Sequence, residues 1–252
     1  MIRILAITLW FVVVFASAGA LSPRAADAPC TFNASLGALD AAQQNTTGIN
    51  YLQVVREELR MRKSLLGNIL DCSVQEAENL KGTLSGMQRS EGGIETTRTN
   101  LARALDSAMS YYASEKSTIG NLGIRGTQDA ARAVRAWRAT HYEPTAQGVV
   151  ALLLWTKNQN LFQVAENRLA QIENTIKKLK LGDNDEVTSL VAKASDNLAE
   201  AKKLNQDARN ALLHIDEGTE PLTVVKNSLD ALSKTYQAFF DVSEAVKKFF
   251  PH

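Results

Sequence analysis

Apolar residues recur at steps of three and four over long stretches of this chain, most regularly near its middle. Between residues 149 and 181 these steps place the apolar side chains on one side of a 3.6-residue helix, with mostly polar and basic side chains opposite. Residues 149–155 are apolar on every side, which predicts burial by several neighbours, but this run is far shorter than the roughly 20 residues that cross a membrane. We expect one long central helix. Its apolar positions are Val150, Leu153, Leu154, Leu161, Val164, Ala165, Leu169, Ile172, Ile176 and Leu179.

A shorter arginine-rich helix from residue 127 is predicted to precede the central helix, with a bend at Glu143 and Pro144. Proline disfavours helical geometry at the residue before it, yet it fits the first turn of a new helix. Trp137, His141 and Tyr142 come just before this bend, and we interpret them as packing the corner between two helices. The alternative is a small-ligand pocket or a partner contact. The side chains assigned to that candidate site are Trp137, Arg138, His141, Tyr142 and Trp155.

A near-heptad apolar stripe over residues 50–87 predicts another long helix, with a kink near Gly67 or Asp71. The sequence Glu91-Gly92-Gly93 interrupts this pattern, and a further helix is expected over residues 94–116. Because the connection is short, the two helices should form an antiparallel hairpin.

Three glycines at steps of three, Gly120, Gly123 and Gly126, predict a loop that ends at Thr127, the expected N-cap of the arginine-rich helix. With no strand before it, this spacing is neither a dinucleotide fingerprint nor a phosphate-binding P-loop. The arginines near it are interpreted as a solvated face, or as partners of carboxylates on a neighbouring helix. The alternative is contact with an anion, such as an anionic polymer or a lipid headgroup. The candidate anion contacts are Arg125, Arg132 and Arg135.

Two more helices are expected after the central one. Gly182 is the predicted stop and residues 183–185 supply caps for a helix that runs to about residue 215. Several of its core positions are alanine, which allows a partner helix to approach closely. Pro221 suits the first turn of the last helix, whose aromatic side chains would fill the space opposite the alanines.

The first 20 residues resemble a signal peptide: Arg3, an apolar segment, and small residues with an A-x-A pattern. We expect cleavage near residue 20, followed by an irregular lead segment over residues 21–48 and a helical bundle over 49–252. A cleaved protein would be extracytoplasmic, either periplasmic or secreted. The alternative is an anchor formed by an uncleaved N-terminal helix, the one case in which a membrane would be a partner.

The two cysteines, Cys30 and Cys72, are predicted to form a disulfide, because export would place them in an oxidising compartment. In the chain-entropy model, closing a loop of about 40 residues stabilises the fold by about 4 kcal/mol. The alternative is a pair of free or lipid-modified thiols. The C-x-x-C spacing of redox enzymes is missing from the sequence.

Composition fits a globular protein, with 45% hydrophobic and 22% charged residues. Removing residues 1–20 takes away one charged side chain, Arg3, and leaves 27 basic and 27 acidic residues. This balance argues against nucleic-acid binding, which needs a net basic surface. The predicted fold class is all-α: an elongated antiparallel bundle of about five long helices with coiled-coil-like packing, made of a hairpin over 49–117 and helices over 127–250.

The sequence supplies no catalytic motif. Its three histidines lack partners at metal-ligand spacing, and the common hydrolase motifs are missing. We therefore assign no catalytic residue, metal or cofactor. The favoured function is a non-enzymatic envelope scaffold or accessory subunit whose partner is a protein, either a second copy or an envelope component. The alternatives are a small-ligand carrier or sensor domain, and a cell-wall-active enzyme with a carboxylate pair from distant positions.

These expectations predict the mass of the purified mature protein. Cleavage near residue 20 should remove the N-terminal segment, and a Cys30–Cys72 bridge should lower the mass by two hydrogens. Alkylation without reductant should then leave the mass unchanged. Two added alkyl groups would contradict the disulfide, and an intact N-terminus would contradict the cleaved form.

Overall fold

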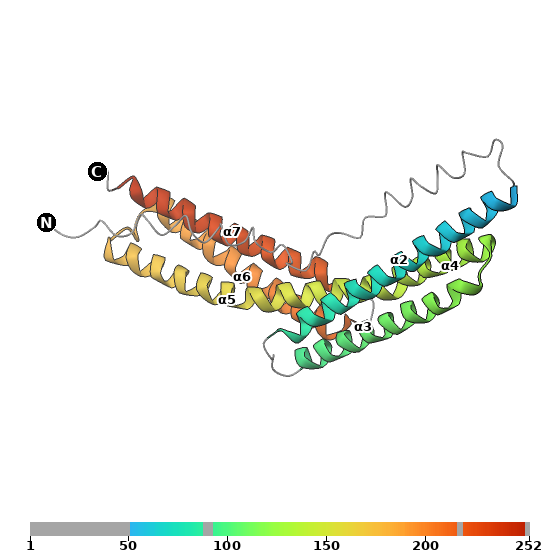
Figure 1. The fold of residues 1–252 in the computed structure, drawn as a ribbon. Coiled ribbons are helices and arrows are strands. Elements are labelled where there is room, and N and C mark those ends of the chain that lie inside the picture. The colour runs from blue at the N-terminus through green and yellow to red at the C-terminus, as the bar shows by residue number, and fades with distance from the viewer. Residues whose placement is uncertain (1–50, 88–92, 216–218, 250–252) are drawn as a thin grey trace.

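The computed structural model describes residues 51–87, 93–215 and 219–249, and its helices and turns follow one another along an elongated, bent molecule (Figure 1). The described part contains helices and no strand, so the prediction of an all-α fold of about five long helices with antiparallel neighbours is confirmed. The elements are α2 (Tyr51–Ser85), α3 (Gly93–Thr118), the 3₁₀ turn η2 (Ile119–Asn121), α4 (Ile124–Trp137), the π-helical turn η3 (Arg138–Tyr142), α5 (Glu143–Lys178), α6 (Asp185–Leu213) and α7 (Pro221–Lys247).

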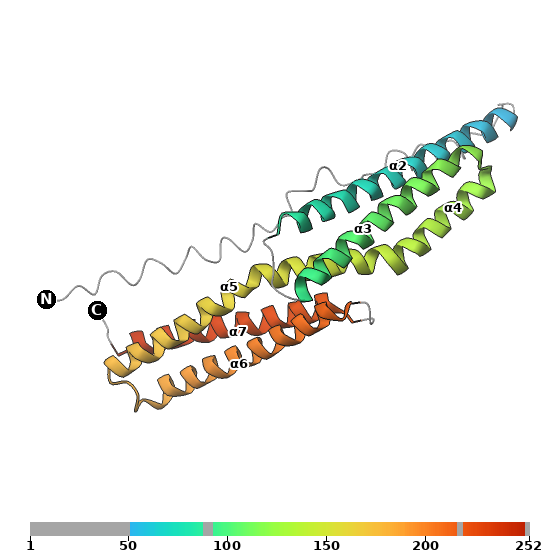
Figure 2. The same cartoon turned by 90° about the horizontal axis from the view of Figure 1, so that it is seen from below.

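The helices form two arms that meet at an angle, and α5 belongs to both (Figures 1 and 2). The hairpin arm contains α2, α3 and α4, together with the start of α5. The distal arm contains α6 and α7, which pack on the remainder of α5. This division matches the apolar pattern of α5: Val149, Ala151 and Leu152 are fully buried among several helices, although Val150 is exposed.

The core of the hairpin arm also includes residues from the ends of α6 and α7, which connects the two arms. Leu70, Leu105 and Leu152 lie in this cluster, and so do Leu212 from α6 and Val225 from α7. Both ends of the α6–α7 connection are therefore held against the hairpin arm. The junction is a packed core, so the angle between the arms is fixed by side-chain packing.

Alanines in α6 allow close packing against α7, as predicted. Ala194 and Ala201 are fully buried and share a cluster with Leu232 and Phe239 of α7. Small side chains on one helix leave room for large ones on the other, so the two surfaces interlock without voids. The helix α6 begins at an Asn184 cap whose side chain accepts a hydrogen bond from the Val187 amide at 3.0 Å.

Side-chain hydrogen bonds set the register between α5 and α6. The side-chain amides of Gln159 and Asn205 exchange two hydrogen bonds of 3.1 Å each. Next to them, the Trp155 indole donates a hydrogen bond to the backbone carbonyl of Asn205 at 3.3 Å. Sliding either helix by one turn would leave these half-buried groups unpaired, at a cost of about 1–3 kcal/mol for each lost partner.

The first helix is continuous through Gly67 and Asp71, and the kink predicted there stays a prediction. Two other local predictions are wrong. The arginine-rich helix starts at Ile124 with Gly123 as N-cap, so Thr127 lies inside the first turn, where its hydroxyl donates to the Ile124 carbonyl at 2.7 Å.

The second wrong prediction is the stop at Gly182. The helix α5 ends four residues earlier, at Lys178. Lys180 adopts a left-handed conformation with φ 55°, and the Leu181 amide closes the turn on the Ile176 carbonyl at 3.0 Å. A lysine thus occupies the position where glycine is the usual residue.

The predicted signal peptide, the lead segment and Cys30 all fall within residues 1–50, outside the described residues. Cys72 lies half-buried on α2 and is not a free thiol. Its predicted pairing with Cys30 stays a prediction. Among the described helices, none combines the length and the hydrophobicity that a membrane crossing requires.

Two glycine-to-alanine variants test the packing at the junction of the arms. Gly148 is buried, and a Cβ there would lie 2.3 Å from Cδ1 of Ile215 and 3.1 Å from Cδ2 of Leu101. Gly67 on α2 has open space around it. Gly148→Ala should lower the free energy of unfolding by about 1 kcal/mol after the gain in helix propensity, since Ile215 must move. Gly67→Ala should raise it by about 0.5–1 kcal/mol. Equal effects in urea denaturation would contradict close packing at Gly148.

Candidate functional site

The π-helical turn η3 is the most unusual backbone feature of the described chain, and a group of aromatic and charged side chains surrounds it. Pro144 follows closely and has no amide hydrogen to continue the regular ladder. The Glu143 amide instead bonds to the Arg138 carbonyl, five residues back. Single π turns of this kind frequently occur at functional sites.

The wider turn determines which way Tyr142 points. Eight α-helical residues after Val134 would carry Tyr142 about 80° around the helix from it. The extra residue in the π turn brings the side chain back toward the face of Val134. The Val134 and Tyr142 side chains are both buried in the core of the hairpin arm, and Tyr142 is only 1% exposed.

Five rings from α3, α4 and η3 form what we call the aromatic cluster. Trp137 lies between Tyr111 and His141, with ring centroids at 4.0 Å and 5.1 Å and nearly parallel planes. Tyr112 meets Tyr142 edge to face at 5.9 Å. Such contacts contribute about 0.5–1.5 kcal/mol each beyond the burial of area. The predicted corner packing is therefore present, with two tyrosines of α3 added to it.

Arg138 connects the aromatic cluster to α2. One of its terminal nitrogens lies 3.1 Å and 2.9 Å from the two carboxylate oxygens of Glu76, and its guanidinium carbon lies 4.6 Å from the Tyr142 ring centroid. Burial disfavours the charged guanidinium, but the hydrogen bond and charge of Glu76 outweigh burial and raise the pKa of Arg138. The arginine stays charged and holds α2, α4 and the π turn together.

Two phenol groups of the aromatic cluster are buried without a hydrogen bond. The hydroxyls of Tyr112 and Tyr142 have no partner among the described residues. Burial raises the pKa of Tyr142, and the negative charge of Glu76 adds to the effect while Arg138 opposes it. Burial likewise raises the pKa of Tyr112, and the positive charge of Arg138 acts in the opposite direction with a smaller effect. Both phenols are neutral near pH 7, so they can offer hydrogen bonds but not a phenolate base.

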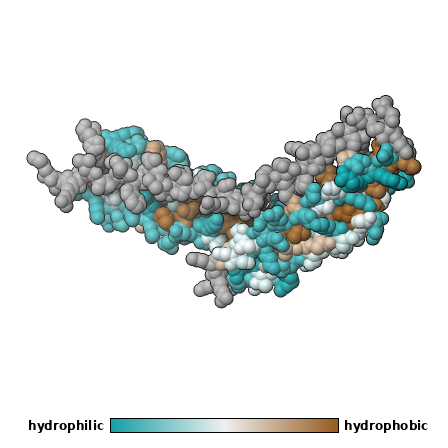
Figure 3. Space-filling model, viewed as in Figure 1, coloured by the Kyte–Doolittle hydropathy of each residue, from teal (hydrophilic) through white to brown (hydrophobic). Residues whose placement is uncertain are grey.

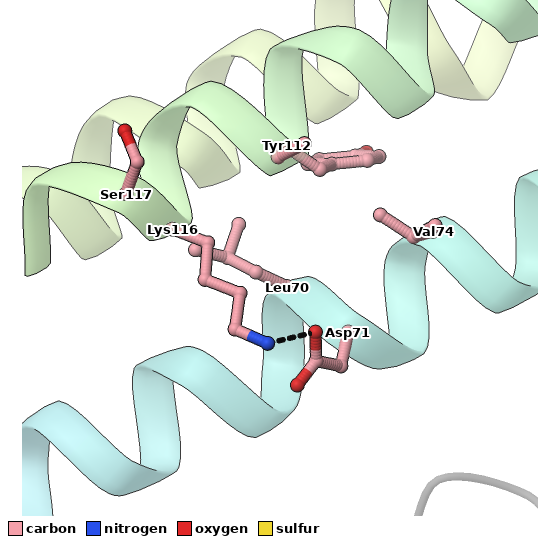
Figure 4. A pocket seen from close by; sticks show the side chains of 7 residues that line it. Leu70, Asp71, Val74, Tyr112, Lys116 and Ser117 are labelled. Atoms are coloured by element: carbon pink, nitrogen blue, oxygen red, sulfur yellow. Dashed lines mark hydrogen bonds and ion pairs between the residues drawn. The ribbon is translucent and has the colours of Figure 1, made fainter.

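An open groove runs between α2 and α3 beside the aromatic cluster, with a volume of about 510 Å³ (Figure 4). Leu70 and Val74 supply apolar surface from α2. At one side, the Lys116 ammonium lies 2.5 Å from the Asp71 carboxylate and bridges the two helices. The groove is thus mostly apolar with one ion pair. Its lining residues are Leu70, Asp71, Val74, Tyr112, Ala113, Lys116 and Ser117.

The structure brings four of the five predicted contact residues together. Trp137, Arg138, His141 and Tyr142 surround the π turn, and Trp155 lies about 20 Å further along α5, where it bonds to α6. A single pocket that includes Trp155 is therefore not formed. Of the five predicted contact residues, Trp137, Arg138, His141 and Tyr142 therefore lie around the π turn, and Trp155 lies apart from them.

Sequence reasoning missed Glu76, Tyr111 and the role of Tyr112. Both tyrosines lie within the helix expected over residues 94–116, but the sequence does not show which distant rings they meet. No local pattern marks Glu76, because its partner Arg138 is 62 residues away in the chain. A search for carboxylates able to pair with Arg138 would have returned many equivalent candidates.

The candidate anion contacts Arg125, Arg132 and Arg135 are all exposed, and their spacing places them on one side of α4. Arg132 pairs with Asp129 of the same helix, three residues before it, and not with a neighbouring helix. The predicted anion contact stays a prediction. Within the described residues, no group of histidine, cysteine and carboxylate side chains could hold a metal ion.

No protein-family model matches this chain, and comparison with curated proteins and with solved structures finds no match either. The arrangement itself can offer hydrogen bonds from neutral phenols, a fixed guanidinium and flat aromatic faces. These groups can bind a ligand through hydrogen bonds, charge and ring stacking.

The raised pKa of Tyr142 predicts how stability depends on pH. A tyrosine whose folded pKa lies above its ordinary value of 10.0 contributes its full stability below that pH and loses it as the pH rises further. The free energy of unfolding of the wild type should therefore fall above about pH 10. Tyr142→Phe should flatten part of this fall, and near pH 8 it should stay within about 1 kcal/mol of the wild type because its hydroxyl is unpaired.

The control for this experiment is Trp137→Phe. It removes no titrating group, so it should lower stability by a similar amount at every pH. Urea denaturation from pH 8 to 11.5 measures both variants. An unchanged alkaline slope in Tyr142→Phe would show that Tyr142 is not buried as described.

Proposed function

We propose that this chain is an exported, non-enzymatic helical-bundle protein that acts through protein–protein contacts, as an envelope scaffold or accessory subunit. The observation that carries the proposal is an exposed apolar surface on the distal arm, along the outer seam of α5 and α7. We call it the α5/α7 strip. It consists of the exposed Val164 and Phe240 and of the half-buried Leu161 and Tyr236, which also pack against the core of the distal arm.

One hydrogen bond fixes how α5 and α7 face each other at the strip. The Tyr236 hydroxyl donates to the Leu161 carbonyl at 3.3 Å. The two helices run in the same direction, because α6 connects them along the chain and runs in the opposite direction to both (Figure 1). One turn further along, Val164 of α5 therefore comes opposite Phe240 of α7.

Both of these residues lie on the side of the seam away from α6. The α6-facing side of α5 is marked by Glu166, which pairs with Lys202, and Val164 is about 160° from it around the helix. Val164 is 43% exposed and Phe240 is 49% exposed. The space-filling view shows a hydrophobic patch on the otherwise mostly hydrophilic distal arm (Figure 3).

A protein partner would gain binding energy from this surface. Burying a fully exposed valine or phenylalanine is worth about 1.5–3 kcal/mol. Because Val164 and Phe240 are each somewhat less than half exposed, covering the remainder is worth roughly half of that for each. Tyr236 adds an aromatic ring of the kind enriched at interfaces. The long, bent shape offers such surfaces on both arms. The partner is a second copy of this chain or another envelope component.

Export, the cleaved signal peptide and the Cys30–Cys72 disulfide are parts of the same proposal. The apolar segment at residues 4–16 and the small residues after it support export. The position of Cys72 on α2 as a thiol that is not free agrees with an oxidising compartment.

A small-ligand carrier is the second candidate, and one observation favours it. Tyr112, whose hydroxyl has no partner among the described residues, lines the groove between α2 and α3, and the ring of Tyr142 contacts the ring of Tyr112. A ligand with a hydrogen-bond acceptor would satisfy the Tyr112 hydroxyl. Native mass spectrometry of protein purified gently from its host distinguishes the candidates, because a carrier retains the extra mass of a small molecule.

Site-specific photo-crosslinking tests the protein-contact proposal. A photoreactive phenylalanine analogue at position 240 should form a crosslinked protein adduct in the host envelope. The same analogue at position 195, an exposed serine of α6, should give at least several-fold less adduct. The double variant Val164→Asp with Phe240→Asp should reduce co-purification of the partner at unchanged helical content. Equal crosslinking at both positions would contradict a role for the strip.

A further inference from the structure

The short helix α4 differs from the other described α-helices in its charge. Its 14 residues contain three arginines and one aspartate, which give a formal charge of +2. Each of the other described α-helices, counted over its own residues, has a formal charge between −1 and +1. The shortest of these helices therefore carries the largest net charge.

The three arginines of α4 lie on the side of the helix that faces away from the core. Thr127 and Val134 are its buried residues, and at about 100° per residue the arginines are centred about 140° from them. Arg125, Arg132 and Arg135 are all exposed, and α4 runs along one side of the hairpin arm (Figure 2). We call these three residues the arginine face of α4.

The described fold leaves most of this charge uncompensated. Arg138, which directly follows α4, pairs with Glu76 on α2, and Arg132 pairs with Asp129 of its own helix. Arg125 and Arg135 form no ion pair within the part of the chain that the structure describes. Two guanidinium groups are therefore available to an external anion.

The exposed residues beside the arginines offer a partner little besides charge. Ala131, Ala133 and Ala136 are exposed, and α4 has no exposed large hydrophobic side chain. Protein interfaces use aromatic and apolar side chains at their centre, and single-stranded nucleic acids stack their bases on aromatic rings. The arginine face lacks these groups, so it suits a partner that presents negative charge on its surface.

We propose that the arginine face of α4 binds the phosphate groups of an anionic phospholipid bilayer, in a reversible contact at the headgroup surface. The planar guanidinium matches phosphate oxygens and can bind two of them at once. The three arginines extend over about 15 Å along the helix axis, so they reach neighbouring headgroups of one flat surface together. Because no large apolar side chain accompanies them, the helix stays at the surface and does not insert.

This contact is separate from the function proposed above. The α5/α7 strip lies on the other arm and offers apolar side chains, whereas the arginine face acts through charge. Each basic side chain near an anionic membrane strengthens binding about five-fold, and the attraction falls off over one Debye length. Binding through the arginine face should therefore be weak, dependent on anionic lipid and sensitive to salt.

Vesicle co-sedimentation with the whole purified protein tests the proposal. Vesicles of phosphatidylcholine mixed with phosphatidylglycerol should bind the protein, and vesicles of phosphatidylcholine alone should bind it about ten-fold less tightly. Raising the salt from about 0.1 M to about 1 M shortens the Debye length from about 10 Å to about 3 Å and should release the protein.

Two matched double variants locate the contact. Arg125→Gln with Arg135→Gln removes the two arginines without an ion pair and should weaken binding to the mixed vesicles at least about ten-fold. Lys193→Gln with Lys203→Gln removes the same charge from exposed positions of α6 and should change binding less than about two-fold. Circular dichroism should show unchanged helical content in both, because all four side chains are exposed.

Several outcomes would overturn the proposal. Absence of binding to the mixed vesicles would do so directly, and binding that ignores phosphatidylglycerol and salt would indicate an apolar contact instead. Equal losses in the two double variants would show that the net charge of the protein, and not the arginine face, drives binding. If the wild type binds soluble polyglutamate but not the vesicles, and Arg125→Gln with Arg135→Gln loses that binding, the partner is an acidic protein.

Discussion

The fold depends on one nearly continuous helical path, α4, the π turn and α5, that must serve two different cores. Its first part packs against α2 and α3, and its last part packs against both α6 and α7, which also contact each other. The π turn changes the phase of this path within the hairpin arm and brings Tyr142 to the side of Val134, so that both side chains reach the same core. It forms where Pro144 has already removed a backbone donor. The regular helix α5 then continues from the hairpin-arm core, at Leu152, to the distal core, at Phe162.

The side chains around the π turn stabilise this irregularity. Trp137 stacks on Tyr111 and His141, and Arg138 ties the turn to Glu76 on α2. The cost is visible in the two buried hydroxyls of Tyr112 and Tyr142, which are unpaired among the described residues. Residual cost of this kind is typical of sites under a functional constraint, which is why the same place is the second candidate for ligand binding.

The distal arm exposes two large apolar side chains of the α5/α7 strip, Val164 and Phe240. We assign this surface to a partner protein, because both side chains lie away from α6 on the outer side of the seam between α5 and α7.

The sequence by itself determined the all-helical class, the helices to within a few residues at most ends, and the pairing of an alanine-rich helix with an aromatic one. These features depend on apolar spacing, proline and glycine, which act over a few residues along the chain. Tertiary structure alone decided the π turn, the Arg138–Glu76 pair, the separation of Trp155 from the aromatic cluster, and the left-handed Lys180. Each of these depends on which distant helix lies opposite, and 62 residues separate Glu76 from Arg138. Local spacing holds no information about that distance, because many carboxylates would satisfy the same arginine equally well.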